Sequence, residues 1–157
     1  MKMSAYVSPH VVPEWLRQDV LPHAPQHGDR ALARFWKIEC LFRTIDALVR
    51  EHAEPNWDGY DAAALSPNAA EVAKRLITAM PIDLPLPEAC PDPDGGIGLD
   101  WMVAPTMICS VGCSPDGACC FAALMGDASE SGTFPFGTSD AFPESLARCI
   151  REVVSHA

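Results

Sequence analysis

Basic side chains are scarce in this sequence. Its 157 residues include 11 Lys and Arg against 21 Asp and Glu, which gives a formal net charge of −10 at pH 7. Because binding to nucleic acid requires cations that neutralise phosphates, this balance argues against nucleic acid as a direct ligand. Residues 51–100 alone carry ten acidic and two basic side chains. Such a segment suits a basic protein surface, although acidity also keeps soluble proteins in solution without any partner.

The sequence also lacks long apolar runs. None approaches the roughly 20 residues that a transmembrane helix needs, and no apolar segment typical of a secretory signal follows Met1. We therefore expect no membrane association and a cytoplasmic location.

The seven cysteines are odd in number and have apolar neighbours, so we expect reduced, buried thiols. They are Cys40, Cys90, Cys109, Cys113, Cys119, Cys120 and Cys149.

Recognisable catalytic and metal-binding patterns are missing as well. The chain has no G-x-S-x-G, H-E-x-x-H or P-loop motif. The run from Asp92 to Gly96 resembles a calcium loop, but position five is glycine and position twelve is Val103 instead of glutamate. The cysteines lack C-x-x-C zinc spacing. We expect no metal and no cofactor, while a cysteine and a histidine that meet only in the folded chain stay possible.

The chain is long enough for one domain with a real core, and its first 80 residues predict an arm followed by helices. Residues 1–28 form a proline-rich arm in which residues 13–20 can make two helical turns. Asp29 is a suitable N-cap for a helix over residues 30–52, whose apolar side chains recur at three- and four-residue steps. Ser66 followed by Pro67 predicts a second helix that ends near residue 80.

The second half of the chain predicts a sheet. Residues 81–96 form a proline-rich crossing, and the hydrophobic period then changes to two over residues 97–136. Ser114-Pro115-Asp116-Gly117 predicts a hairpin turn that sets Cys113 opposite Cys119. Residues 140–156 predict a closing helix. We therefore expect a single α+β domain over residues 1–157, in which helices pack on one antiparallel meander of about four strands.

Two acidic turns supply the candidate partner-binding residues. The segment 56–61 reads as a structural loop with an Asx turn, a positive φ at Gly59 and aromatic side chains that hold it to the core. The competing interpretation is an exposed aromatic loop that binds another protein, because Trp and Tyr are common hot-spot residues, but the structural interpretation is favoured because aromatic side chains often fill cores. The turn 91–96 adds further acidic groups. The candidate partner-binding residues are Trp57, Asp58, Tyr60, Asp61, Asp92 and Asp94.

Cys113 and Cys119 form a second candidate site. The predicted hairpin places them opposite one another, so oxidation could join them if the sulfur geometry allows. The competing interpretation is that both are inert core thiols, because buried apolar cysteines react slowly.

The order of turn motifs resembles a family of small bacterial proteins of unassigned function. The resemblance rests on Asn-Trp-Asp-Gly-Tyr at 56–60, Pro-Asp-Gly-Gly-Ile at 93–97, Trp101 and Ser-Gly-Thr at 131–133, and it covers about residues 54–155. These are turn and packing residues, so the resemblance implies a shared fold and carries over no catalytic residue.

The leading hypothesis is a non-enzymatic module that binds a basic protein surface. Concrete forms are an antitoxin, an immunity-type inhibitor or a small component of a mobile defence or counter-defence system, with a toxin, nuclease or effector complex as its partner. One alternative is a small cysteine-dependent enzyme. Another is a structural homodimer whose interface includes Phe35, Trp36 and Phe42.

Overall fold

The computed structural model describes residues 30–137 and 140–156. The chain divides into two units, Met1–Trp36 and Lys37–Ala157. Helix α1 (Arg30–Glu51) begins in the first unit, of which only residues 30–36 are described, and continues into the second. The predicted arm and the predicted N-cap at Asp29 lie outside the described residues.

Helices α2 (Pro67–Ala79) and α3 (Glu144–Val154) belong to the second unit. The predicted start of α2 is confirmed: the Ser66 hydroxyl accepts a hydrogen bond from the Asn68 amide at 3.2 Å, and Pro67 occupies the first turn. Helix α3 begins later than the predicted residue 140. A proline disfavours the helical conformation in the residue before it. Phe142 therefore stays outside the helix, and Pro143 occupies the N-cap position.

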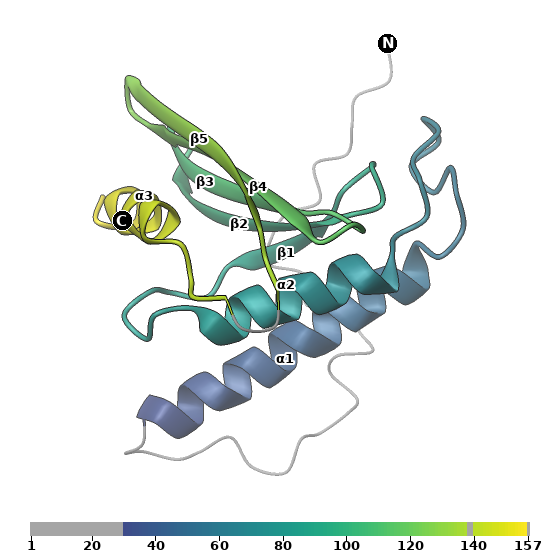
Figure 1. Ribbon diagram of the computed structural model, residues 1–157, viewed down its shortest axis with the longest axis horizontal. Coiled ribbons are helices and arrows are strands. Elements are labelled where there is room, and N and C mark those ends of the chain that lie inside the picture. Colours follow the sequence, from purple (N-terminus) through teal and green to yellow (C-terminus); the bar gives the residue numbers. More distant parts are fainter. Residues whose placement is uncertain (1–29, 138–139, 157) are drawn as a thin grey trace. The chain divides into compact units, whose positions relative to one another are not determined.

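Five antiparallel strands form one sheet in sequence order (Figure 1). They are β1 (Glu88–Pro91), β2 (Ile97–Ala104), β3 (Met107–Cys113), β4 (Ala118–Met125) and β5 (Ala128–Pro135). The predicted α+β class is thus confirmed, with five strands in place of about four. The additional strand, β1, lies inside the segment that we predicted as a proline-rich crossing.

Strand β1 tolerates Pro91 because the strand pairs on one side only. The amide of Asp92 bonds to the Gly96 carbonyl at 3.1 Å, so even-numbered residues face β2 and odd-numbered residues face outward. The backbone nitrogen of Pro91 therefore faces away from β2, and its lack of an N–H group removes no hydrogen bond from the sheet. Proline usually argues against a strand, but Pro87 and Pro91 are four residues apart and both fall on the outward-facing positions of this edge.

The predicted register of the β3–β4 hairpin is confirmed. Cys113 lies opposite Cys119, and the pairing continues to Met107 opposite Met125. The turn has the expected form: Gly117 has a φ of 86°, and the Ser114 amide donates to the Ala118 carbonyl at 2.9 Å.

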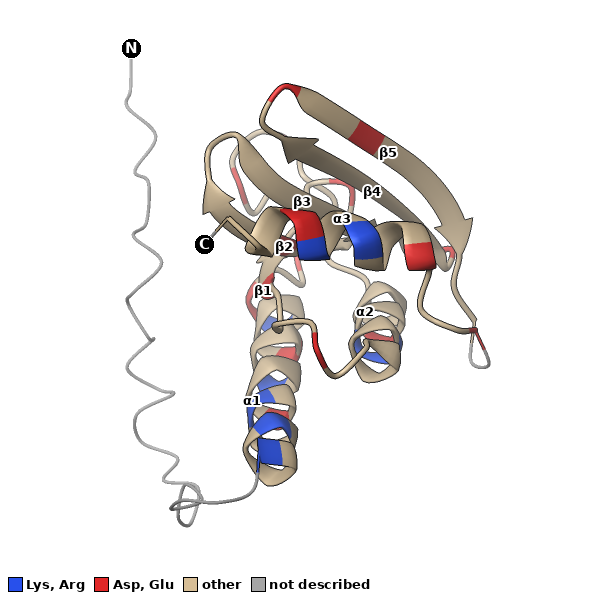
Figure 2. Ribbon diagram, turned by 90° about the vertical axis from the view of Figure 1, so that its left-hand side faces the viewer, with Lys and Arg blue, Asp and Glu red and all other residues tan. Residues whose placement is uncertain are grey.

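One face of the sheet carries the core. Helix α3 packs across β2, β3 and β4, and α2 packs against β2 and β3. Residues 37–51 of α1 lie alongside α2 (Figures 1 and 2), and Ile45 joins the same buried cluster. Among the described helices, none combines the length and the apolar character of a membrane-spanning segment.

Strand β2 allows a direct test of this layer arrangement. Leu99 is fully buried, whereas Met102, three residues along the same strand, is 54% exposed. Leu99→Ala is expected to lower the free energy of unfolding by about 2–5 kcal/mol because it leaves a cavity. The matched control Met102→Ala is expected to cost less than about 1 kcal/mol. Urea unfolding measures both, and equal losses would contradict the assignment of the core face.

Candidate functional site

The loop between α1 and α2, residues 52–66, is held by its own backbone. Asn56 and Asp61 have positive φ angles of 62° and 70°, in the left-handed region that asparagine and aspartate tolerate better than most residues. The amide of Asn56 donates to the Ala62 carbonyl at 2.6 Å, and the Asn56 side-chain oxygen accepts from the Asp61 amide at 2.9 Å. The loop is therefore a defined structure that closes on itself.

Asp58 forms the predicted Asx turn. Its Oδ1 atom accepts hydrogen bonds from the Tyr60 amide at 2.8 Å and from the Ala62 amide at 3.1 Å. The predicted positive φ of Gly59 is also present, at 77°. The Asp58 carboxylate thus shapes the loop from within.

Trp57 attaches the loop to the body of the domain. Its indole Nε1–H donates to the Ala63 carbonyl at 2.8 Å, and its ring lies 4.4 Å from the His52 ring, centroid to centroid. The side chain is half-buried against the core cluster. Trp57 therefore behaves as the structural interpretation predicted.

The turn between β1 and β2, residues 91–96, uses a second Asx turn. The Asp92 Oδ1 atom accepts from the Asp94 amide at 2.9 Å, and the Gly95 amide donates to the Asp92 carbonyl at the same distance. Asp92 is half-buried, whereas Asp94 is exposed.

The structure joins these two segments, which we call the loop pair (residues 52–66 and 91–96). The Ala63 amide donates to the Pro93 carbonyl at 2.8 Å, and the Ser66 amide donates to the Gly95 carbonyl at 2.9 Å. The approach is so close that a Cβ atom on Gly95 would lie 2.9 Å from the Ala64 carbonyl oxygen. Two segments that are distant in sequence therefore form one surface.

The six predicted partner-binding residues separate into two groups on this surface. Trp57, Asp58 and Asp92 are half-buried and make the contacts that hold the loops. The other three side chains face solvent, and Tyr60 is 89% exposed. These exposed residues are Tyr60, Asp61 and Asp94. The structural interpretation required Tyr60 to hold the loop to the core. Its exposure shows that it does not.

Neither segment of the loop pair contains a lysine or an arginine. Lysine, arginine and histidine are absent from Leu76 to Ala147, and lysine and arginine are absent from Glu51 to Ala73. Figure 2 shows the consequence in space, because the blue Lys and Arg segments lie on the helices while the strands carry only Asp and Glu. The loop pair thus presents carboxylates next to an exposed phenol.

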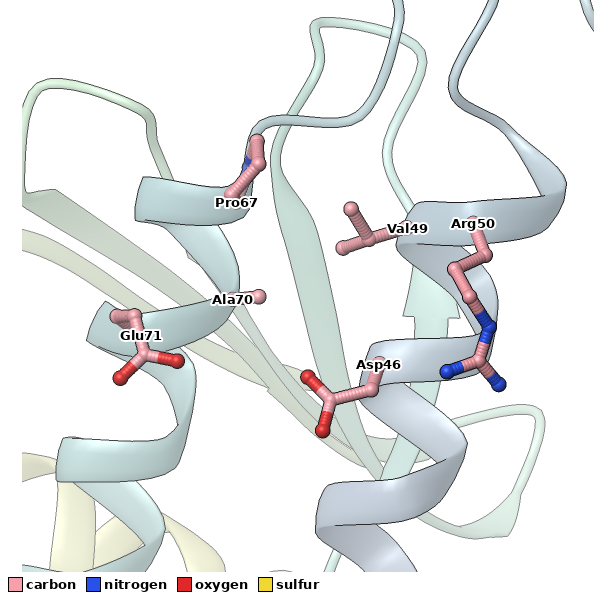
Figure 3. Close-up of a pocket in the computed structure, with 6 residues that line it drawn as sticks. All are labelled: Asp46, Val49, Arg50, Pro67, Ala70 and Glu71. Carbon is pink, nitrogen blue, oxygen red and sulfur yellow. The ribbon is translucent and has the colours of Figure 1, made fainter.

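A shallow groove of about 320 Å³ lies beside the loop pair, between α1 and α2 (Figure 3). Val49, Pro67 and Ala70 give it apolar walls, and charged side chains surround it. Lys74 bonds to two of the charged groups, Asp46 at 2.6 Å and Glu71 at 3.2 Å. Burial opposes the charge of Lys74, but these two carboxylates outweigh that effect and raise its pKa above 10.5.

The predicted redox pair lies in the core. The Cys113 and Cys119 sulfur atoms are 3.8 Å apart, and both side chains are buried. Their hydrogen bond and burial raise the pKa of the Cys113 thiol. The same hydrogen bond lowers the pKa of Cys119, but that thiol has no exposed surface through which a substrate could reach it.

Two of the remaining cysteines, the half-buried Cys90 and the buried Cys109, also make poor nucleophiles, whereas Cys120 is exposed, contrary to the expectation of buried thiols. Burial raises the pKa of Cys90 and of Cys109 to about 12. Within the described residues, neither His52 nor His156 has a cysteine as a hydrogen-bond partner. The same residues contain no group of three His, Cys, Asp or Glu side chains that could hold a metal ion.

The joining of the two loops is the feature that sequence reasoning missed. It rests on backbone N–H and C=O groups, which every residue carries, so the side-chain pattern holds no signal for it. Only the glycine at position 95 hints at the contact, because glycine often marks a close backbone approach.

No protein-family model matches the chain, and searches of curated proteins and of solved structures find no match.

Two glycines with similar backbone angles test the contact between the loops. Gly95 and Gly117 have φ values of 87° and 86°, but a Cβ atom at Gly117 would meet no atom within 4 Å. Gly117→Ala should therefore cost only the conformational strain, about 1–2 kcal/mol. Gly95→Ala should cost more, because its Cβ also displaces the Ala64 carbonyl. Thermal or urea unfolding gives both values, and a loss for Gly95→Ala no larger than for Gly117→Ala would refute the contact.

Proposed function

We propose that this chain is a non-enzymatic protein-binding module that presents the loop pair to a basic partner surface. The concrete forms are an antitoxin, an immunity-type inhibitor or a small component of a mobile defence or counter-defence system. The observation that carries the proposal is Tyr60, a large aromatic side chain held almost fully exposed on a loop with a fixed backbone.

Preorganisation favours binding through such a loop. Ordering a flexible loop and its side chains on association costs free energy. Here the internal bonds of Asn56 and Asp58, and the two bonds to the turn 91–96, already order the backbone. Tyrosine adds contact area at low conformational cost and is enriched among hot-spot residues.

The negative charge of the loop pair favours a partner with a basic surface. Asp61, next to Tyr60 in the sequence, and Asp94, on the other segment of the loop pair, are both exposed, and no Lys or Arg occurs between Arg50 and Lys74 in the sequence. A basic surface complements this arrangement and accelerates encounter, most strongly at low ionic strength. A nuclease, a toxin that binds nucleic acid, or an effector complex has a surface of this kind.

The two alternatives find less support. A cysteine-dependent enzyme needs an accessible thiolate beside a base, and the described thiols with a raised pKa are buried or half-buried. For the homodimer, Phe35 is 60% exposed, but Phe42 packs against the core with the Lys74 ammonium 5.9 Å from its ring centroid.

Affinity purification from the host organism, followed by binding measurements with the purified partner, tests the proposal. Tyr60→Ala is expected to weaken the complex at least about tenfold, in line with tyrosine hot spots. The matched control is Ile82→Ala, because Ile82 is 75% exposed and lies beyond the opposite end of α2 from the loop pair. The double change Asp61→Asn, Asp94→Asn should slow association and weaken its dependence on salt.

Two results would refute the proposal. One is a chain that is always recovered alone from its host. The other is a partner that binds wild type, Tyr60→Ala and the double variant equally well.

A further inference from the structure

The two edges of the sheet are built differently. At the β1 edge, odd-numbered residues face outward, and Pro87 and Pro91 stand on either side of Ala89. Ala89 is therefore the one residue of this four-residue strand that offers an outward N–H group. Short length and prolines are established means of preventing a sheet edge from pairing with another chain.

The β5 edge is twice as long and largely open. The amide of Phe136, directly after the strand, donates to the Gly117 carbonyl at 3.1 Å, so even-numbered residues face β4. Ser129, Ser131 and Thr133 consequently direct their N–H and C=O groups away from the sheet. All three residues are exposed, and β4 is the only described strand paired with β5 (Figure 1).

Apart from Pro135, the last residue of the strand, the usual protections are missing from this edge. Strand β5 contains no lysine, and its pairing with β4 runs without a register shift over all eight residues. Its single charge, Glu130, lies on the side of α3, where Arg148 binds both carboxylate oxygens at 2.8 and 2.7 Å. An exposed strand edge of this length without such protection is a template for pairing.

We propose that the β5 edge pairs with β5 of a second copy of this chain, antiparallel and around a two-fold axis at Ser131. In this register Ser131 faces its own copy, and Ser129 faces Thr133. Each of these pairs can exchange two N–H···O=C hydrogen bonds, and the hydroxyl side chains meet as favourable cross-strand pairs.

The sequence of β5 favours this register over its neighbours. Moving the axis to Glu130 sets two like charges directly opposite each other, which destabilises a sheet. Moving it to Gly132 sets Ser129 opposite Pro135, which has no N–H group to donate. With the axis at Ser131, Glu130 lies opposite Gly132 and keeps its ion pair with Arg148. The contact region is then locally neutral despite the net charge of −10.

Analytical ultracentrifugation of the full chain between about 5 and 200 µM tests the proposal, with concentrations that bracket a micromolar dissociation constant. The wild type is expected to form dimers. Ser131→Pro should weaken dimerisation at least about tenfold, because it removes the central outward donor from both copies. It should leave the fold intact, since Pro91 and Pro135 already occupy outward positions in this sheet. Ser131→Ala keeps the N–H group and should weaken dimerisation much less than Ser131→Pro, because it removes only the hydroxyl pair.

Ser131→Glu provides a second variant that preserves every backbone group. It brings two carboxylates together on the axis, so dimerisation should weaken at low salt and recover in part at high salt. This variant keeps the proposal testable if Ser131→Pro unfolds, which circular dichroism would reveal.

Each contrary result overturns the proposal. A wild type that stays monomeric at 200 µM has no β5–β5 interface. A dimer that neither Ser131→Pro nor Ser131→Glu weakens uses another surface, such as the one around Phe35. A monomer whose Ser131 amide exchanges slowly with deuterium has that amide hydrogen-bonded without a second copy. The β5 edge is then covered by something other than β5 of another chain. None of these readouts depends on the loop pair or on its partner.

Discussion

The contact between residues 63–66 and 93–95 links the start of helix α2 to the sheet. Helix α2 begins directly after Ser66, and strand β2 begins directly after Gly96, so two backbone hydrogen bonds hold the starts of both elements together. The side chain of Asn68 adds a third link, because it donates to the Pro115 carbonyl in the β3–β4 turn. The apolar face of α2 can then lie along β2 and β3 with a set register, and the same bonds create the surface that we propose binds a partner.

Side chains serve two distinct purposes within that surface. The carboxylates of Asp58 and Asp92 accept backbone amides and are largely committed to shaping the loops. Those of Asp61 and Asp94 are exposed and contribute charge. A carboxylate can therefore belong to an acidic surface and still act mainly as a structural acceptor, and only the geometry separates the two roles. Tyr60 fits the proposed binding role best, because an exposed aromatic ring on a fixed backbone contributes little to the stability of the free protein.

The parts of the fold with side-chain signatures could be predicted from the sequence. Alternation of apolar residues and the Ser-Pro-Asp-Gly turn determine the β3–β4 register, because a shift by one residue would turn the core face toward water. The Ser66 cap and Pro67 determine the start of α2. Strand β1 escaped prediction because proline usually argues against a strand, and only the spacing of Pro87 and Pro91 reveals an outer edge. The loop contact escaped because it is made by backbone groups, and the solvent exposure of Tyr60 could not be separated from burial by composition alone.

The central claim is that the loop pair is one ordered surface before any partner binds. Residue-resolved hydrogen–deuterium exchange of the free protein tests it most directly, through the amides of Ala63 and Ser66. If both are bonded to the turn 91–96, they should exchange as slowly as the paired amides of β2, because both are released only when the domain opens. Exchange at the rate of an unprotected loop, with β2 still protected, would show that the loops are not joined and would contradict the preorganised surface.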